Sequence, residues 1–81
     1  MNNNYLFAID KNSAEIIVSE SPKGSNKINL VERLKRSENE ILYNAVVTLT
    51  SIAAAPKLDV PTFKAMDKVC QLIYSNLKKS A

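Results

Sequence analysis

The residues best suited to catalysis are few in this chain and stand apart from one another. Histidine is absent, and Cys70 is the one cysteine among 81 residues. A cysteine nucleophile needs a base to deprotonate it, and histidine usually has that role at neutral pH. Cys70 lies between Met66 and Ile73 in an apolar helical stripe, so we interpret it as a buried structural thiol.

The carboxylates and the single glycine form no pattern typical of a metal or phosphate site. The Asp and Glu residues form neither a zinc-protease motif nor a calcium loop, and Gly24 alone cannot build a phosphate-binding loop. Glu32, Glu38 and Glu40 alternate with basic residues at spacings typical of a solvated helix face. We therefore expect no catalytic residue, no metal and no cofactor, and hence no enzyme activity.

Residues 52–66 resemble a helix-turn-helix pattern. Ile52 would belong to the supporting helix and Leu58 would fill the turn. The residues then placed for contact with a nucleic acid or another partner are Thr62, Lys64 and Lys68, with Arg33, Lys35 and Arg36 available for phosphates. Lys57, however, occupies the turn position at which such motifs usually have glycine. A plain helical hairpin is favoured, and a small DNA-binding transcriptional regulator is the alternative.

The net charge and the uncharged stretches limit the classes of partner. Eleven Lys and Arg against eight Asp and Glu give a net charge of +3, which does not by itself indicate nucleic-acid binding. The first ten residues lack the basic start and apolar run of a signal peptide. The longest uncharged stretch, 41–56, is too short to cross a bilayer. We therefore expect a cytoplasmic protein without a membrane partner.

Residues 5–20 predict a β-hairpin. Tyr5, Phe7 and Ile9 alternate with their neighbours, and 14–19 is rich in β-branched residues. In the turn between them, Asp10 is suited to bond the turn amides and Asn12 to adopt a left-handed backbone. Residues 21–28 then predict a linker.

The first predicted helix spans 29–55. Asn29 is a favourable N-cap, Glu32 completes a capping box, and Pro56 prevents continuation. Ser37 begins a second candidate capping box, so the alternative is a break that leaves a short piece, 30–36, before a helix over 38–55.

The second predicted helix spans 59–79. Asp59 is suited to cap it, and Pro61 lies in its first turn, where the missing amide proton costs nothing. The short connection after Pro56 predicts that the two helices are antiparallel neighbours. The fold class expected is α+β: one domain, 1–81, with an N-terminal β-hairpin packed on an antiparallel helical hairpin (ββαα).

The absence of charge over 41–56 indicates a helix that is covered nearly all round. Since 81 residues provide little to cover it, we expect an oligomer, with a dimer favoured. The expected interface consists of Ala45, Thr48, Leu49, Ile52 and Ala53. The alternative is a monomer in which Asn44, Thr48 and Ser51 form an exposed polar stripe.

Together these features predict a small non-catalytic regulator or inhibitor that acts by binding another protein. Its asparagine- and lysine-rich composition suits an AT-rich genome, such as that of a phage or other mobile element. The sequence leaves two alternatives for the binding surface. One is the basic face of the helices, and the other is the outer edge of the hairpin, where unpaired backbone groups are able to accept a strand.

Overall fold

The protein contains a three-stranded sheet followed by two helices. The structure is a computed structural model that describes residues 4–22 and 26–80. Its elements are β1 (Asn4–Asp10), β2 (Glu15–Ser21), β3 (Asn29–Lys35), a 3-10 turn η1 (Arg36–Glu38), α1 (Glu40–Ala53) and α2 (Val60–Ser80). The α+β class, with an N-terminal sheet and two helices, is therefore confirmed. The sheet has one strand more than the hairpin that the sequence predicts.

The predicted hairpin is present and forms two thirds of the sheet. β1 and β2 are antiparallel, with Phe7 opposite Val18 and Asp10 opposite Glu15. In the turn, the Asp10 side chain accepts a hydrogen bond of 3.0 Å from the amide of Asn12, as predicted. The left-handed residue of this turn is Ala14, with φ of 53°, so the prediction of that conformation for Asn12 is wrong.

The prediction of a helix over 29–39 is wrong, because 29–35 forms β3 and η1 follows it. β3 pairs antiparallel with β2, so β2 is the central strand and its peptide groups are satisfied on both sides. The spacing of Leu30 and Leu34 suits one face of a helix, as do the capping residues Asn29 and Glu32, so the local pattern of this segment favours a helix. In the strand, Glu32 and Leu34 face one side, and Arg33 faces the other.

The capping and linker predictions in the same region also need correction. Asn29 begins a strand and caps no helix. The longer helix starts two residues later than the predicted 38–55 piece, after Asn39, and ends at Ala53. Ser21 belongs to β2 and not to the linker, whereas Gly24 lies outside the described residues.

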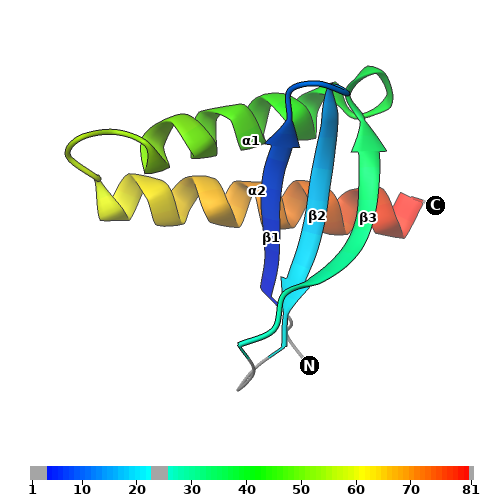
Figure 1. Cartoon of the computed structure of the whole chain (residues 1–81), viewed down its shortest axis with the longest axis horizontal. Coiled ribbons are helices and arrows are strands. Elements are labelled where there is room, and N and C mark those ends of the chain that lie inside the picture. The colour runs from blue at the N-terminus through cyan, green and yellow to red at the C-terminus, as the bar shows by residue number, and fades with distance from the viewer. Residues whose placement is uncertain (1–3, 23–25, 81) are drawn as a thin grey trace.

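Both helices lie on one face of the sheet and run across its strands (Figure 1). α1 and α2 pack side by side and antiparallel, as predicted. α2 starts close to its predicted first residue, and Asp59 precedes it as the expected cap, accepting a 3.4 Å hydrogen bond from the amide of Thr62.

The core lies between the sheet and the two helices. Its fully or almost fully buried side chains are Ile16, Val18, Leu42, Val46, Leu49, Cys70 and Tyr74. Tyr74 of α2 reaches the sheet, where its ring packs edge-to-face on Tyr5 and Phe7, with centroids 4.8 and 5.8 Å away. The helices therefore depend on the sheet for one side of their core.

A candidate protein-binding site

β1 is an edge strand, and part of its outer side faces no other element of the sheet. In the described chain the strand order is β1-β2-β3, so β1 has a neighbour on one side only. Near the start of the strand, the Gln71 side chain of α2 donates a hydrogen bond to the carbonyl of Tyr5. Farther along the strand, no side chain of the described residues donates a hydrogen bond to the backbone of Phe7 or Ile9. Backbone groups at a sheet edge of this kind can pair with another chain.

The helical hairpin extends beyond this free edge. Figure 1 shows the C-terminal end of α1, the connecting turn and the N-terminal part of α2 projecting past β1. The sheet therefore covers only part of the helices' length. The edge of β1 and the projecting parts of the two helices meet at an angle, and a hollow of about 370 Å³ lies between them. We call this hollow the β1 corner; it is lined by Leu6, Phe7, Ala8, Ile9, Lys11, Leu49, Thr50, Ala53, Phe63 and Asp67.

The β1 corner is mainly apolar. Leu49 is almost completely buried at its base, Phe63 is half-buried, and Ala53 is exposed and small. The hydroxyl of Thr50 donates a 2.8 Å hydrogen bond to the carbonyl of Val46, so its donor is already used within α1. An apolar side chain could enter the corner without leaving that hydroxyl proton unpaired.

Two charged residues also line the β1 corner. Lys11 follows the end of β1, and Asp67 belongs to α2. Hairpin edge and corner together offer backbone hydrogen bonds beside apolar surface, the combination by which proteins bind an extended peptide segment. The sequence indicates the hairpin edge, but the corner requires the position of α1 and α2 relative to β1, which no local pattern encodes.

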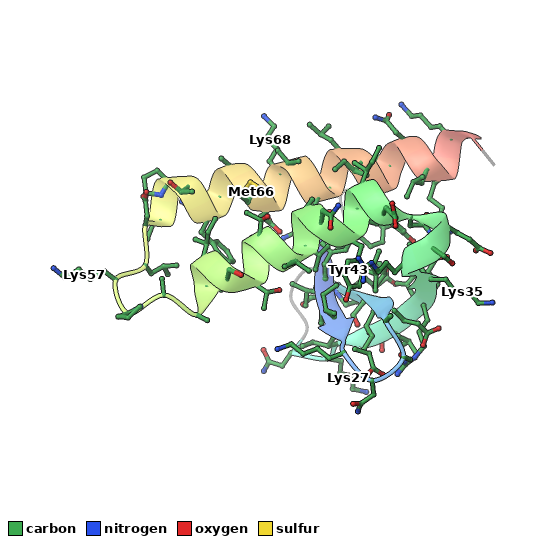
Figure 2. The ribbon with its side chains drawn as sticks, turned by 90° about the horizontal axis from the view of Figure 1, so that it is seen from above. Lys27, Lys35, Tyr43, Lys57, Met66 and Lys68 are labelled. Carbon is green, nitrogen blue, oxygen red and sulfur yellow. The ribbon has the colours of Figure 1, made fainter. Side chains whose placement is uncertain are left out.

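The predicted basic contact residues do not form one surface. Figure 2 shows Lys68 on the outer side of α2 and Lys35 on the opposite side of the molecule, beside the strands. Lys64 is exposed on α2 as well. Thr62 is engaged at the start of that helix, where its hydroxyl donates a hydrogen bond to Asp59.

The two arginines that the sequence predicts as partner contacts are held by intramolecular contacts. The guanidinium of Arg33 lies 3.2 Å from the carboxylates of both Asp10 and Glu15. The guanidinium of Arg36 lies over the ring of Tyr43, 5.1 Å from its centroid. These contacts fix the end of β3 and η1 against the rest of the fold.

The residues expected at an oligomer interface have different environments in α1. Leu49 is buried in the core, Ala45 and Ile52 are half-buried, and Thr48 and Ala53 are exposed. The exposed hydroxyl of Thr48 donates a 3.0 Å hydrogen bond to the carbonyl of Asn44. The side chains of this set therefore do not form one continuous exposed patch.

A polar cluster that the sequence did not indicate joins α2 to β3. The Tyr74 hydroxyl donates a hydrogen bond to the Glu32 carboxylate, which also forms an ion pair with Lys78. Partial burial tends to raise the pKa of Glu32, but the hydrogen bonds from Lys78 and Tyr74 outweigh it and lower the pKa below its usual value. Burial and the adjacent carboxylate raise the pKa of Tyr74. Both groups thus hold the protonation states that this hydrogen bond needs.

Cys70 is buried in the core, in agreement with its predicted structural role. Burial, followed by the nearby Asp67, raises the pKa of its thiol to about 11. A thiol in this environment stays protonated at neutral pH and is a poor nucleophile.

The described residues form neither a metal-binding cluster nor a membrane-spanning helix. Within 4–22 and 26–80, no three or more Asp, Glu or Cys side chains gather closely enough to hold a metal ion. Over the same residues, neither helix has the length and apolar character needed to span a bilayer.

Comparisons with known proteins identify no relative. No family model matches the chain, and neither the curated proteins nor the solved structures include a significant match.

Proposed function

We propose that this protein is a non-catalytic module that binds another protein by accepting an extended segment along β1. The single observation that carries this proposal is the direct contact between the free edge of β1 and the apolar hollow under it. The edge offers backbone hydrogen bonds, and the hollow offers a place for side chains. Neither feature alone would distinguish a peptide site from an ordinary sheet edge.

An added strand is suited to both parts of the site. Its successive side chains point to opposite faces, so every second residue would face the projecting helices. Those side chains would contact Phe63 and Ala53 in the β1 corner, whereas the others would face solvent. The preferred segment is therefore extended, with apolar residues at alternate positions.

A second copy is a poorer occupant of this edge than a foreign segment. If two copies paired through antiparallel β1 strands, a two-fold axis perpendicular to the sheet would place both pairs of helices on the same face. Each helical hairpin already projects past its own β1 (Figure 1), so the two hairpins would compete for the same space. A segment without attached helices avoids this conflict.

The role that suits such a module is regulation or inhibition. A small protein that sequesters an extended segment of its target prevents that segment from reaching other partners. We include in the proposal the cytoplasmic location and the phage or mobile-element origin that the composition favours.

The geometry offers less support for the DNA-binding alternative. The helices of a helix-turn-helix cross at about 90–120°, whereas α1 and α2 run antiparallel side by side. The residues expected to contact phosphates belong to β3 and η1, and Figure 2 shows one of them, Lys35, far from Lys68 of the expected recognition helix.

A displayed library of random peptides tests the proposed site. We expect the protein to enrich peptides with alternating apolar residues, and a labelled peptide to shift the backbone NMR signals of β1 and of the β1 corner. Ala53→Glu should weaken binding at least about tenfold, since it places a charge in the apolar hollow. Ala55→Glu is the matched control, because it adds the same charge two residues away, outside the hollow.

Equal peptide affinity of the two variants would contradict the proposed site. NMR shifts confined to the outer faces of the helices would contradict it as well. Far-ultraviolet circular dichroism of both variants shows that a loss of binding does not reflect unfolding.

A further inference from the structure

The face of the sheet that is turned away from the helices is apolar at its centre. Antiparallel sheets commonly expose polar residues on a solvated face. Here the residues that share the uncovered side, by the pairing of β1, β2 and β3, include Leu6, Ala8, Ile17, Ser19 and Leu30, with Arg33 of β3 beside Ile17 as the one charged residue of the central row. Leu6 is 41% exposed and Leu30 is 61% exposed. We call this surface the open face.

The charged end of the open face is divided by sign. Asp10 on β1 and Glu15 on β2 lie in one row with Lys35 on β3. Arg33, also on β3, forms ion pairs with both carboxylates. The β1 side of the open face is therefore acidic, and the β3 side is basic.

We propose that a second copy of this chain covers the open face, with a two-fold axis lying between the two sheets and parallel to β2. Rotation about this axis exchanges left and right, so β1 of one copy lies over β3 of the other. The two sheets then form a sandwich with the helices on its outer sides. Face-to-face packing of two sheets with nearly aligned strands is common in β-sandwiches.

The residues of the open face are complementary under this rotation. Leu6 of one copy lies opposite Leu30 of the other, because both share a row with Ser19 on the central strand. Asp10 lies opposite Lys35 in the same way, so both ends of the charged row meet an opposite charge. Glu15, on the central strand, lies opposite its own counterpart, and the ion pair with Arg33 of the same copy offsets each of these two charges. The central strand contributes Ile17, which lies opposite its own counterpart close to the axis. This charge complementarity favours a second copy as the occupant.

The size of the face agrees with a reversible dimer. Three strands of seven residues cover roughly 330 Å², given a spacing of about 4.8 Å between strands and a rise of about 3.3 Å per residue. With side-chain relief, two such faces bury on the order of 1,000 Å² in total, the lower limit for a specific interface. We therefore expect dissociation on dilution within the micromolar range.

This dimer and the β1 corner are separate inferences. The corner lies mainly on the helix side of the sheet, and the dimer covers the opposite side; Leu6 and Ala8 of β1 belong to the open face and also line the edge of the corner. Peptide binding by a wild type that stays monomeric at the highest concentrations would contradict the dimer and leave the proposed corner site intact.

Sedimentation velocity over a wide micromolar concentration range tests the dimer. We expect the wild type to be dimeric at the upper end, and Leu30→Glu to raise the dissociation constant at least about 100-fold because it buries a carboxylate against Leu6 of the other copy. Lys35→Glu is a second variant at an exposed position, and it should raise the constant at least about tenfold because it faces Asp10 of the other copy. Thr48→Glu, on the exposed side of α1, should leave the constant unchanged.

A wild type that stays monomeric throughout the range would overturn the proposal. Dissociation caused by Thr48→Glu but not by Leu30→Glu would also overturn it and would assign the interface to α1. Thermal unfolding of each variant establishes that the compared proteins are folded.

Discussion

At the scale of single residues, the most consequential side chain is Tyr74. It is 1% exposed, packs against two aromatic rings of β1, and donates a hydrogen bond to Glu32 on β3. One side chain of α2 thus contacts both outer strands of the sheet. The sequence predicts an apolar helical stripe around Cys70, but not the bond between Tyr74 and Glu32, because the two residues are 42 positions apart.

Replacing Glu32 tests the importance of this contact. Glu32→Ala leaves the buried Tyr74 hydroxyl without its acceptor, and we expect a loss of about 1–3 kcal/mol in the free energy of unfolding. Urea denaturation measures the loss. Glu38→Ala is the control at an exposed position, and an equal loss in both variants would contradict the structural role given to Glu32.

The titratable groups predict lower stability at both extremes of pH. The pKa of Asp10 is lowered by hydrogen bonds, chiefly from Arg33, and that of Glu32 is lowered as described above, from ordinary values of 3.8 and 4.5. The unfolded chain therefore binds protons before the folded one, and stability falls as the pH drops below about 4.5. The Cys70 thiol has the opposite effect, because its pKa is raised from 9.0 to about 11 in the folded protein. The unfolded chain therefore loses this proton first, and the free energy of unfolding falls as the pH rises between these values.

Midpoints of urea denaturation, measured from pH 3 to pH 11, test the predicted loss of stability at acidic and at alkaline pH. We expect a plateau between about pH 5 and pH 9, with a fall on either side. Cys70→Ala should reduce the loss on the alkaline side, and an alkaline limb unchanged by this variant would contradict the assignment.

At the scale of elements, the sequence predicts those whose local signals agree and misses the one whose signals conflict. The alternation in β1 and the stripe in α2 have one interpretation each, and both elements are present. Residues 29–35 carry leucines spaced for a helix, but β2 needs a second neighbour for its peptide groups. That requirement comes from the sheet, so the residues of β3 alone do not reveal it.

Asp59 is an element-scale signal that the sequence interprets correctly. Its carboxylate accepts hydrogen bonds from the amide and the hydroxyl of Thr62 at the start of α2. We expect Asp59→Ala to lower the free energy of unfolding by about 1 kcal/mol, whereas Asp59→Asn should retain most of the stability because asparagine is also a good cap. Equal losses in thermal denaturation of the two variants would show that the cap is not what stabilises this end of α2.

At the scale of the whole molecule, the candidate site arises from an unequal fit between its two layers. The helices extend beyond the sheet, and this overhang creates the β1 corner (Figure 1). The sequence predicts a hairpin edge and a helical hairpin but not how far one extends past the other, since that depends on Tyr74 and the other core contacts. The expected α1 interface fails to form one exposed patch for the same reason: packing against the sheet buries Leu49.

The central claim is that the protein binds another protein through the β1 corner, and one capture experiment tests it most directly. Tagged wild type, Ala53→Glu and Ala55→Glu are used to capture partners from a lysate of the native host, with and without nuclease, and the bound proteins are measured by mass spectrometry. We expect one protein in near-stoichiometric amount, unaffected by nuclease, present with the wild type and Ala55→Glu and lost with Ala53→Glu. Recovery of nucleic acid with proteins that disappear after nuclease treatment, or equal capture by all three forms, would contradict it.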